Sequence, residues 1–426
     1  MRGGAVRPES KTAGPPEAAY TRGIRSQGDD LNSFNDSSYQ SGHSLETLAQ
    51  LRSALNSVMS LDSHLSRDDG AYEFRGRLVV DSAEAFDHIY GRFTALGFTP
   101  MLFRRDGQEV VLAQRGVARP RALNPWVNII LFGLTIISTI LAGMMMNPST
   151  ALQAYFRRGG DVFSAALQNP AFLLDGLPHA LALLAILGVH EMGHYVLGRI
   201  HKADVTLPYF IPMPPLGILT FGTMGAVILM RSPIKNRRQL FDIGVAGPLA
   251  GLAVAIPLIL VGLATSPVKP IPTDPYIQEG NSILYLALKL LVHGRVLPGD
   301  GLDVSLSAVA FAAWFGLFIT SLNLLPIGSL DGGHVTYSVF GRLQWQIARG
   351  VWLIMIAAGI ALALLTNQGL LNLWLFWALL VQVFGMRHPA PLDDITPLDP
   401  KRRALGIFTM LLFVLLIVPI PLTIVI

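Results

Sequence analysis

Two histidines and a glutamate lie together in a stretch of sequence that is otherwise apolar. His190, Glu191 and His194 form the pattern H-E-x-x-H, and the flanking residues 181–189 and 195–198 carry almost only apolar side chains and glycine. On a helix, residues four apart share one face, so both imidazoles can bind a single Zn²⁺ while Glu191 acts as base for a water at the metal. Because ionisable residues are expensive at membrane depth and usually functional there, the pattern predicts a hydrolytic metal site within a membrane.

A catalytic zinc site needs a third protein ligand, and the best candidate is Asp331. The chain has no cysteine, which excludes thiolate ligands. Asp331 follows a second apolar segment, in a stretch where Pro326 and Gly328 break the helix and permit irregular backbone. If the spans alternate in direction, this stretch and His194 approach the same side of the membrane. We therefore predict one Zn²⁺ bound by both histidines and Asp331, with His334 as a rival third ligand.

Composition places the chain among integral membrane proteins. Of its 426 residues 51% are hydrophobic and only 14% charged, whereas soluble domains average about 25% charged. Its basic residues sit beside apolar segments, which argues for topology signals and against a nucleic-acid partner. Most of them fall on one side when the spans alternate, which predicts a multi-pass protein with a cytoplasmic N-terminus. Seven segments approach the length of a span, at 125–146, 177–200, 240–264, 305–328, 350–366, 370–386 and 405–426.

The predicted fold class is mainly α, a polytopic helical membrane protein of about six to seven spanning helices with a small N-terminal α+β soluble domain. Residues 1–45 are polar and predicted to be a disordered tail, and residues 45–66 to form a short amphipathic helix. Residues 46–118 are predicted to form a soluble accessory domain with a β-α-β-β unit. Residues 120–426 are predicted to form a membrane-embedded domain that carries the metal site, with its core at 177–340.

Residues 207–230 are apolar but contain several helix breakers, so a regular spanning helix is not expected there. The pattern favours a re-entrant loop followed by a short strand, from Gly225 to Met230, whose free edge could pair with an unwound substrate. The breakers are Pro208, Pro212, Pro214, Pro215, Gly217, Gly222 and Gly225.

The two motifs together resemble the site-2 protease family of intramembrane zinc metalloproteases. The resemblance rests on His190-Glu191-Met192-Gly193-His194 and on Asn323…Pro326…Leu330-Asp331-Gly332-Gly333, and it covers about residues 177–340. It implies that His190, His194 and Asp331 bind zinc, that Glu191 activates water and that Asn323 positions the substrate backbone. The stretches Pro208–Pro212 and Phe221–Val227 resemble the branch with plastid, archaeal and bacterial members. The segment 265–304, about 40 residues, is too short for the PDZ domain that other bacterial members carry there.

The resemblance implies an intramembrane zinc metalloendopeptidase that acts in regulated intramembrane proteolysis on a single-span membrane-protein substrate. Its expected location is a bacterial cytoplasmic membrane. One alternative is a non-catalytic protein of the same fold that binds membrane helices, although the intact Glu191 argues against it. A second is a metal transporter, but neither motif recurs in the chain, as the repeated halves of transporters would predict. Substrate identity and oligomeric state stay open.

Overall fold

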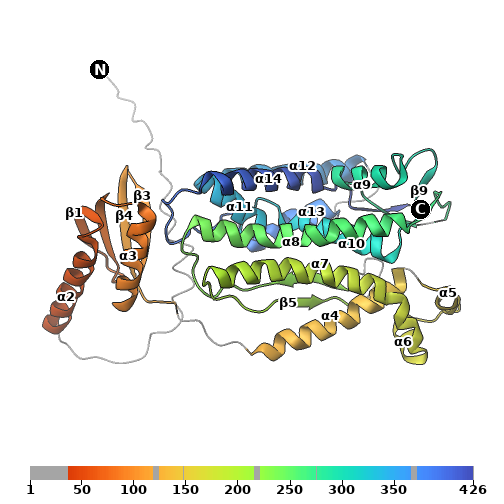
Figure 1. Cartoon of the computed structure of the whole chain (residues 1–426), viewed down its shortest axis with the longest axis horizontal. Helices are drawn as coiled ribbons and strands as arrows, with labels where there is room; N and C mark the ends of the chain where they lie inside the picture. The colour runs from red at the N-terminus through yellow and green to blue at the C-terminus, as the bar shows by residue number, and fades with distance from the viewer. Residues whose placement is uncertain are drawn as a thin grey trace, which may run out of the picture.

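The computed structural model describes residues 37–118, 124–146, 148–214, 221–274, 276–365 and 372–425. It has a small α+β domain that lies beside one end of a helical bundle (Figure 1). The small domain contains a four-stranded antiparallel sheet in the order β1-β2-β4-β3, and two helices share its core through Leu51, Phe86 and Phe93. Its elements are α2 (Ser37–Leu55), β1 (Met59–Ser66), β2 (Tyr72–Leu78), α3 (Ser82–Ala95), β3 (Phe98–Arg105) and β4 (Gln108–Arg115).

This domain confirms the predicted α+β class but corrects its first part. The helix predicted for 45–66 ends at Leu55, and residues 59–66 form the edge strand β1. Met59, Leu61 and Leu65 recur with a period of two, which fits a strand better than a helix. The tail predicted for residues 1–45 is wrong at its end, because α2 already begins at Ser37, and residues 1–36 lie outside the described residues.

The bundle is mainly helical, as predicted, but fewer helices reach the length of a membrane span. Among the described residues, four helices are long and apolar enough to cross a bilayer. They are α4 (Pro125–Met146), α7 (Leu173–Ile200) with the short η1 (Pro170–Phe172) before it, α8 (Arg237–Ala264), and the run from Asp331 to Leu365 formed by α11 (Asp331–Phe340), η2 (Gly341–Leu343) and α12 (Gln344–Leu365).

Three predicted spans are shorter helices: α10 (Ala308–Asn323), α13 (Leu373–Phe384) and α14 (Pro400–Leu416). The last span, predicted for 405–426, is wrong in its second half. Pro419 and Pro421 cannot continue a helix, and β10 (Leu422–Val425) pairs instead with β8 (Tyr276–Glu279). Residues 366 and 370–371, at the edges of two predicted spans, lie outside the described residues.

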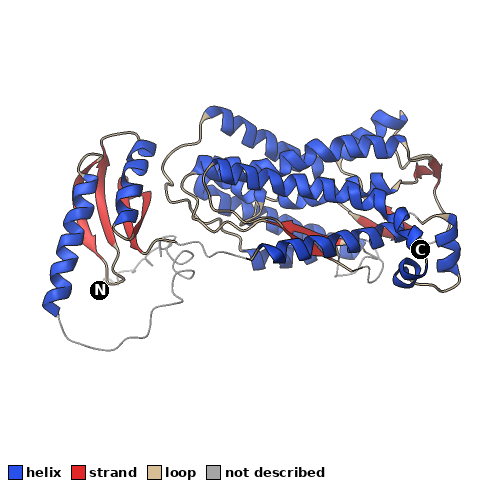
Figure 2. Cartoon of the chain, turned by 60° about the horizontal axis from the view of Figure 1, so that its bottom comes forward, coloured by secondary structure: helices blue, strands red, loops and turns tan. Residues whose placement is uncertain are grey.

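A two-stranded hairpin runs alongside α4 and α7 (Figure 2). Its strands β5 (Tyr209–Pro212) and β6 (Thr223–Val227) are antiparallel. The strand predicted for Gly225–Met230 therefore forms but is shifted, because it begins at Thr223 and ends at Val227. Polar side chains of the neighbouring helices bind its backbone: Asn128 Nδ2 donates to the carbonyls of Leu207 and Pro208, and Ser138 Oγ donates to that of Gly222. Pro215 and Gly217 lie outside the described residues.

The remaining elements are short. α5 (Thr150–Arg157) and α6 (Val162–Gln168) precede η1, and the segment between α8 and α10 holds β7 (Val268–Pro270), β8, α9 (Ile283–His293) and β9 (Leu302–Val304). In its described part this segment contains no PDZ domain, as predicted. Lys289 of α9 is fully buried there and pairs with Glu279 at 3.0 Å and with Asp303 at 3.4 Å. Burial raises the pKa of Glu279, and the nearby ammonium group opposes this shift.

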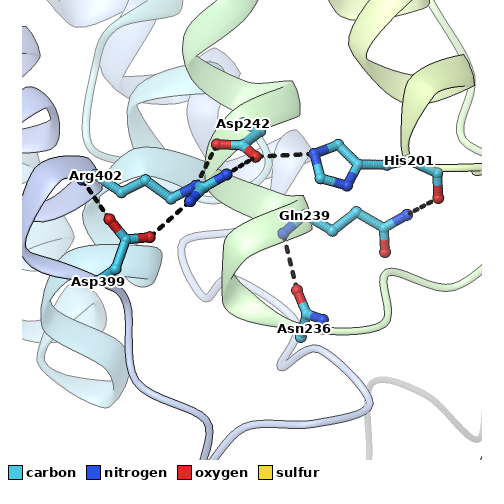
Figure 3. Close-up of polar contacts among 6 residues, drawn as sticks. All are labelled: His201, Asn236, Gln239, Asp242, Asp399 and Arg402. Carbon is cyan, nitrogen blue, oxygen red and sulfur yellow. Dashed lines mark hydrogen bonds and ion pairs between the residues drawn. The ribbon is translucent and has the colours of Figure 1, made fainter. Parts of the chain in front are cut away.

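An ion-pair cluster fixes the helix ends that face the small domain (Figure 3). The Arg402 guanidinium at the start of α14 donates to both carboxylate oxygens of Asp242 in α8, each at 2.7 Å, and to Asp399 at 2.6 Å. His201, which follows α7, contacts the same Asp242 carboxylate at 2.8 Å. The cluster therefore ties the ends of three helices together. Asp242 serves as an acceptor for these neighbours rather than as a metal ligand.

We expect Arg402→Met to lower the thermal unfolding midpoint of the purified protein in detergent by several degrees. The loss of charge-assisted hydrogen bonds of this kind costs about 1–3 kcal/mol. Arg403→Met on the same helix is the matched control, because Arg403 is exposed and forms no ion pair within the described part of the chain. Equal midpoints for the two variants would contradict the structural role given to Arg402.

Candidate metal centre

The two motif histidines lie on one buried face of α7. His190 and His194 are 2% and 5% exposed, and their Nε2 atoms are 3.2 Å apart. The His194 ring is oriented by a hydrogen bond of 2.7 Å between its Nδ1 and the Ile243 carbonyl of α8. Because a carbonyl only accepts, Nδ1 carries the proton and Nε2 presents a lone pair to the cavity. The helix thus holds the Nε2 lone pair of His194 in position to bind a metal.

Asp331 reaches the same point from the start of α11. Its Oδ2 lies 3.3 Å from Nε2 of His190 and 3.2 Å from Nε2 of His194. The loop before it turns at Gly328, which has a φ of +52°. A side chain at Gly332 or Gly333 would overlap the carbonyls of Leu324 and Gly328, respectively, so the predicted breakers permit a close backbone approach. The sequence-predicted ligands are therefore brought together.

The separations of these three atoms fit a tetrahedral zinc site. With Zn–N and Zn–O bonds of about 2.0–2.1 Å, two ligand atoms of a tetrahedron lie about 3.3–3.4 Å apart. The observed separations are 3.2, 3.2 and 3.3 Å. No other group of three or more His, Asp or Glu residues among the described residues meets the same criterion for binding a metal ion. Two imidazole nitrogens and one carboxylate oxygen are also a usual donor set for Zn²⁺.

Glycines on α8 provide the room that the imidazoles occupy. A side-chain carbon at Gly247 would overlap the His194 ring, and one at Gly251 would lie 3.1 Å from His190 Nδ1. A carbon at Gly244 would lie 2.6 Å from Cβ of His334. The sequence alone indicates only close helix packing for these three glycines. The structure adds a specific reason, because the imidazole rings lie against the α8 backbone where other residues would carry a side chain.

A cavity of about 330 Å³ opens onto the three ligand atoms. Glu191 lines it, and so does Asn323, whose Nδ2 lies 3.4 Å from His190 Nε2. One wall is the end of β6 with the extended segment after it, and a second wall comes from the loop between α13 and α14. The first wall contributes Ala226, Val227, Ile228 and Met230, and the second contributes His388, Pro389, Ala390 and Pro391.

The rival ligand His334 takes another position. Its Nδ1 is paired with Nε2 of His388 at 2.6 Å, and it does not belong to the cluster of ligand atoms. The sequence does not indicate that His388 lies in the cavity wall. No local signal could have found it, since His388 lies 54 residues from His334 in the chain.

Comparison with known proteins agrees with this site. Residues 178–366 match the model of Peptidase family M50, which confirms the site-2 protease resemblance and includes all five predicted site residues. The chain is 30% identical to a protein named probable zinc metalloprotease EGY2, chloroplastic, of Arabidopsis thaliana, over 83% of this chain and 61% of the relative. It is 29% identical to probable zinc metalloprotease EGY1, chloroplastic, of Oryza sativa subsp. japonica, over 72% of this chain and 53% of the relative.

The chain thus spans about three fifths of the length of the first of these relatives. No solved structure matches it.

We expect Gly247→Ala to weaken zinc binding at least about tenfold, because the added methyl group displaces the His194 ring. Zinc content after dialysis against a competing chelator measures the effect. Gly188→Ala on α7 is the matched control, since a carbon added there meets nothing within 4 Å. Full zinc content in Gly247→Ala would contradict the location of the site.

Proposed function

We propose that residues 178–366, which form a Peptidase family M50 domain, make this chain a zinc metalloendopeptidase that hydrolyses peptide bonds in or near membrane-spanning helices. The observation that carries the proposal is the convergence of His190, His194 and Asp331 beside Glu191, within helices long enough to cross a bilayer. The expected substrate is a single-span membrane protein, and the expected role is regulated intramembrane proteolysis.

The chain's own residues would divide the chemistry between binding and proton transfer. His190, His194 and Asp331 would hold one Zn²⁺. When bound, the metal supplies Lewis acidity that polarises a peptide carbonyl and acidifies a water. Glu191 would take the proton of the attacking water and return it to the leaving amine. Asn323 could donate its Nδ2 hydrogen atoms to the substrate backbone from the end of α10.

An intramembrane protease must also unwind its substrate, because a helix hides its peptide bonds. In the described part of the chain β6 pairs with β5 alone, and Ala226, Val227, Ile228 and Met230 line the cavity. An extended substrate segment could add to this edge and lie across the ligand atoms. Side chains such as Met224, which is 69% exposed, would contact its apolar residues.

The proposal includes an orientation. The excess of Arg and Lys on one side of the alternating spans supports a cytoplasmic N-terminal domain and a cytoplasmic opening of the site. We propose a bacterial cytoplasmic membrane as the location. The names of the curated relatives place those proteins in the chloroplast.

We expect Glu191→Gln to abolish cleavage of a model single-span substrate in detergent, because an amide cannot accept the proton of the water. The variant should keep one zinc per chain, since Glu191 is outside the ligand cluster. A chelator should abolish the wild-type activity, and added zinc should restore it. Normal cleavage by Glu191→Gln would exclude its role as base. Zinc binding without cleavage of any helix-destabilised substrate would favour the non-catalytic alternative.

We expect Ile228→Pro to reduce kcat/KM at least about tenfold while zinc stays bound, because proline removes a backbone donor from the proposed substrate edge. Ala226→Pro should act in the same direction. Ile228→Ala is the matched control, since it removes the side chain and keeps the N–H. Unchanged cleavage in Ile228→Pro would exclude strand pairing at this edge.

A further inference from the structure

The loop between α13 and α14 connects the small domain with the metal-binding part of the bundle. We call residues 386–396 of this loop the strap. In Figure 1 the loop turns at the end of the bundle that faces the small domain. Its first part, His388 to Pro391, lines the cavity around the metal ligands. Its second part, Leu392 to Thr396, is almost fully buried against the small domain and α8. One short segment therefore touches both units.

The strap joins the small domain as an added strand. The N–H of Leu102 in the edge strand β3 donates to the Leu392 carbonyl at 2.6 Å, and the Leu102 carbonyl accepts from Asp394 N–H at 2.9 Å. The Leu392 side chain is 1% exposed and belongs to the hydrophobic core of the small domain. Ser82 Oγ and Thr396 Oγ1 form a further hydrogen bond of 2.8 Å. On its other side the strap pairs with residues 234–236.

The strap also holds the helix that carries Asp331. His388 contacts His334 at 2.6 Å, and the Asp394 carboxylate accepts from the Tyr337 hydroxyl at 3.0 Å. Asp331, His334 and Tyr337 are three residues apart in sequence, so they lie along one side of α11. Asp394 is 7% exposed and also pairs with Arg237 of α8 at 2.9 Å. The carboxylate thus fixes α11 against α8.

The loop before α11 is also attached to the strap, through Gln344. Gln344, 1% exposed, donates to the carbonyls of Pro326 and Met386, and its Oε1 accepts from His388 N–H at 3.2 Å. Pro389 and Pro391 have no N–H, so between these attachments only Ala390 offers a backbone donor to hold the cavity wall. Its position depends on the anchored residues at both ends of the strap.

We propose that Leu392 and Asp394 are positioning residues through which the small domain, docked on the strap, holds α11 and Asp331 in the geometry of the metal site. This inference rests on the proposed zinc site. The small domain is then an activating element, because its core anchors Leu392 while Asp394 passes the constraint to α11. Release of the strap frees α11 to move away from α7 and weakens the bond between Asp331 and the metal.

The first test is Leu392→Ala in the full chain. Its expected effect is a loss of zinc affinity of about tenfold, within the range for residues that support metal ligands from outside, together with a lower kcat. Competition with a chelator measures the zinc affinity without any need for substrate. If Leu392→Ala does not yield folded protein, Leu392→Val replaces it as the smaller perturbation.

A reversible disulfide staple separates positioning from general destabilisation. The chain has no cysteine, so Ser82→Cys with Thr396→Cys, added to Leu392→Ala, introduces the only thiols, at two side chains already in contact. Oxidation should redock the strap and restore zinc affinity toward wild type, and reduction should remove the gain. Thr265→Cys with Ser307→Cys is the matched control, since these side-chain oxygens are 3.4 Å apart at the other end of α8.

Recovery with the staple at 82 and 396, and none with the staple at 265 and 307, supports the proposal. Unchanged zinc affinity in Leu392→Ala would overturn it, and so would a staple that fails to form or that forms without recovery. If zinc affinity follows the staple while no substrate is cut, the proposed peptidase function fails and the positioning role stands.

Discussion

The structure depends on one electrostatic constraint: three electron-donor atoms meet in a buried cavity. His190 Nε2, His194 Nε2 and Asp331 Oδ2 lie 3.2–3.3 Å from each other. The proton on His194 Nδ1 is committed to the Ile243 carbonyl, so its Nε2 has none to share in the neutral ring. Lone pairs brought this close repel unless a cation lies between them, and burial removes the water that would screen them. A divalent metal relieves the repulsion. The surrounding helices must hold the three atoms at bonding distance, so that the metal–ligand bonds offset the cost of removing water from the metal and its ligands.

That requirement explains features that would otherwise weaken a helical bundle. Glycine inside a helix costs about 1 kcal/mol relative to alanine, yet α8 carries Gly244, Gly247 and Gly251 on the face toward the histidines. The chain between α10 and α11 likewise leaves helical geometry where Asp331 must approach the rings. In both places local helix stability is lower so that the ligand atoms can meet.

The ligands could be predicted from sequence because their signals are local or topological. The spacing of His190 and His194 fixes their common face, and alternation of the spans brings Asp331 to the same end of the bundle. The strap could not be predicted in this way. Leu392 and Asp394 act through partners more than 150 residues away, such as Arg237 and Leu102, and short extended segments carry no period that reveals their neighbours. The predicted lengths of the spans that contain α10 and α14 were wrong for a related reason. The sequence stays apolar beyond Asn323 and Leu416, but proline and loop geometry end the helices there.

Polar residues within the apolar helices fall into two groups, and only the structure separates them. Asn128, Ser138 and His179 donate to backbone carbonyls of the hairpin and its flanks, at 207, 208, 221 and 222, and Gln344 donates to that of Pro326. Irregular backbone at membrane depth is tolerated only when such partners exist. A polar residue in a spanning helix therefore indicates either chemistry or a neighbouring break in regular structure. Here the breaks themselves serve the chemistry, because they produce the strand edge and the loop that surround the metal ligands.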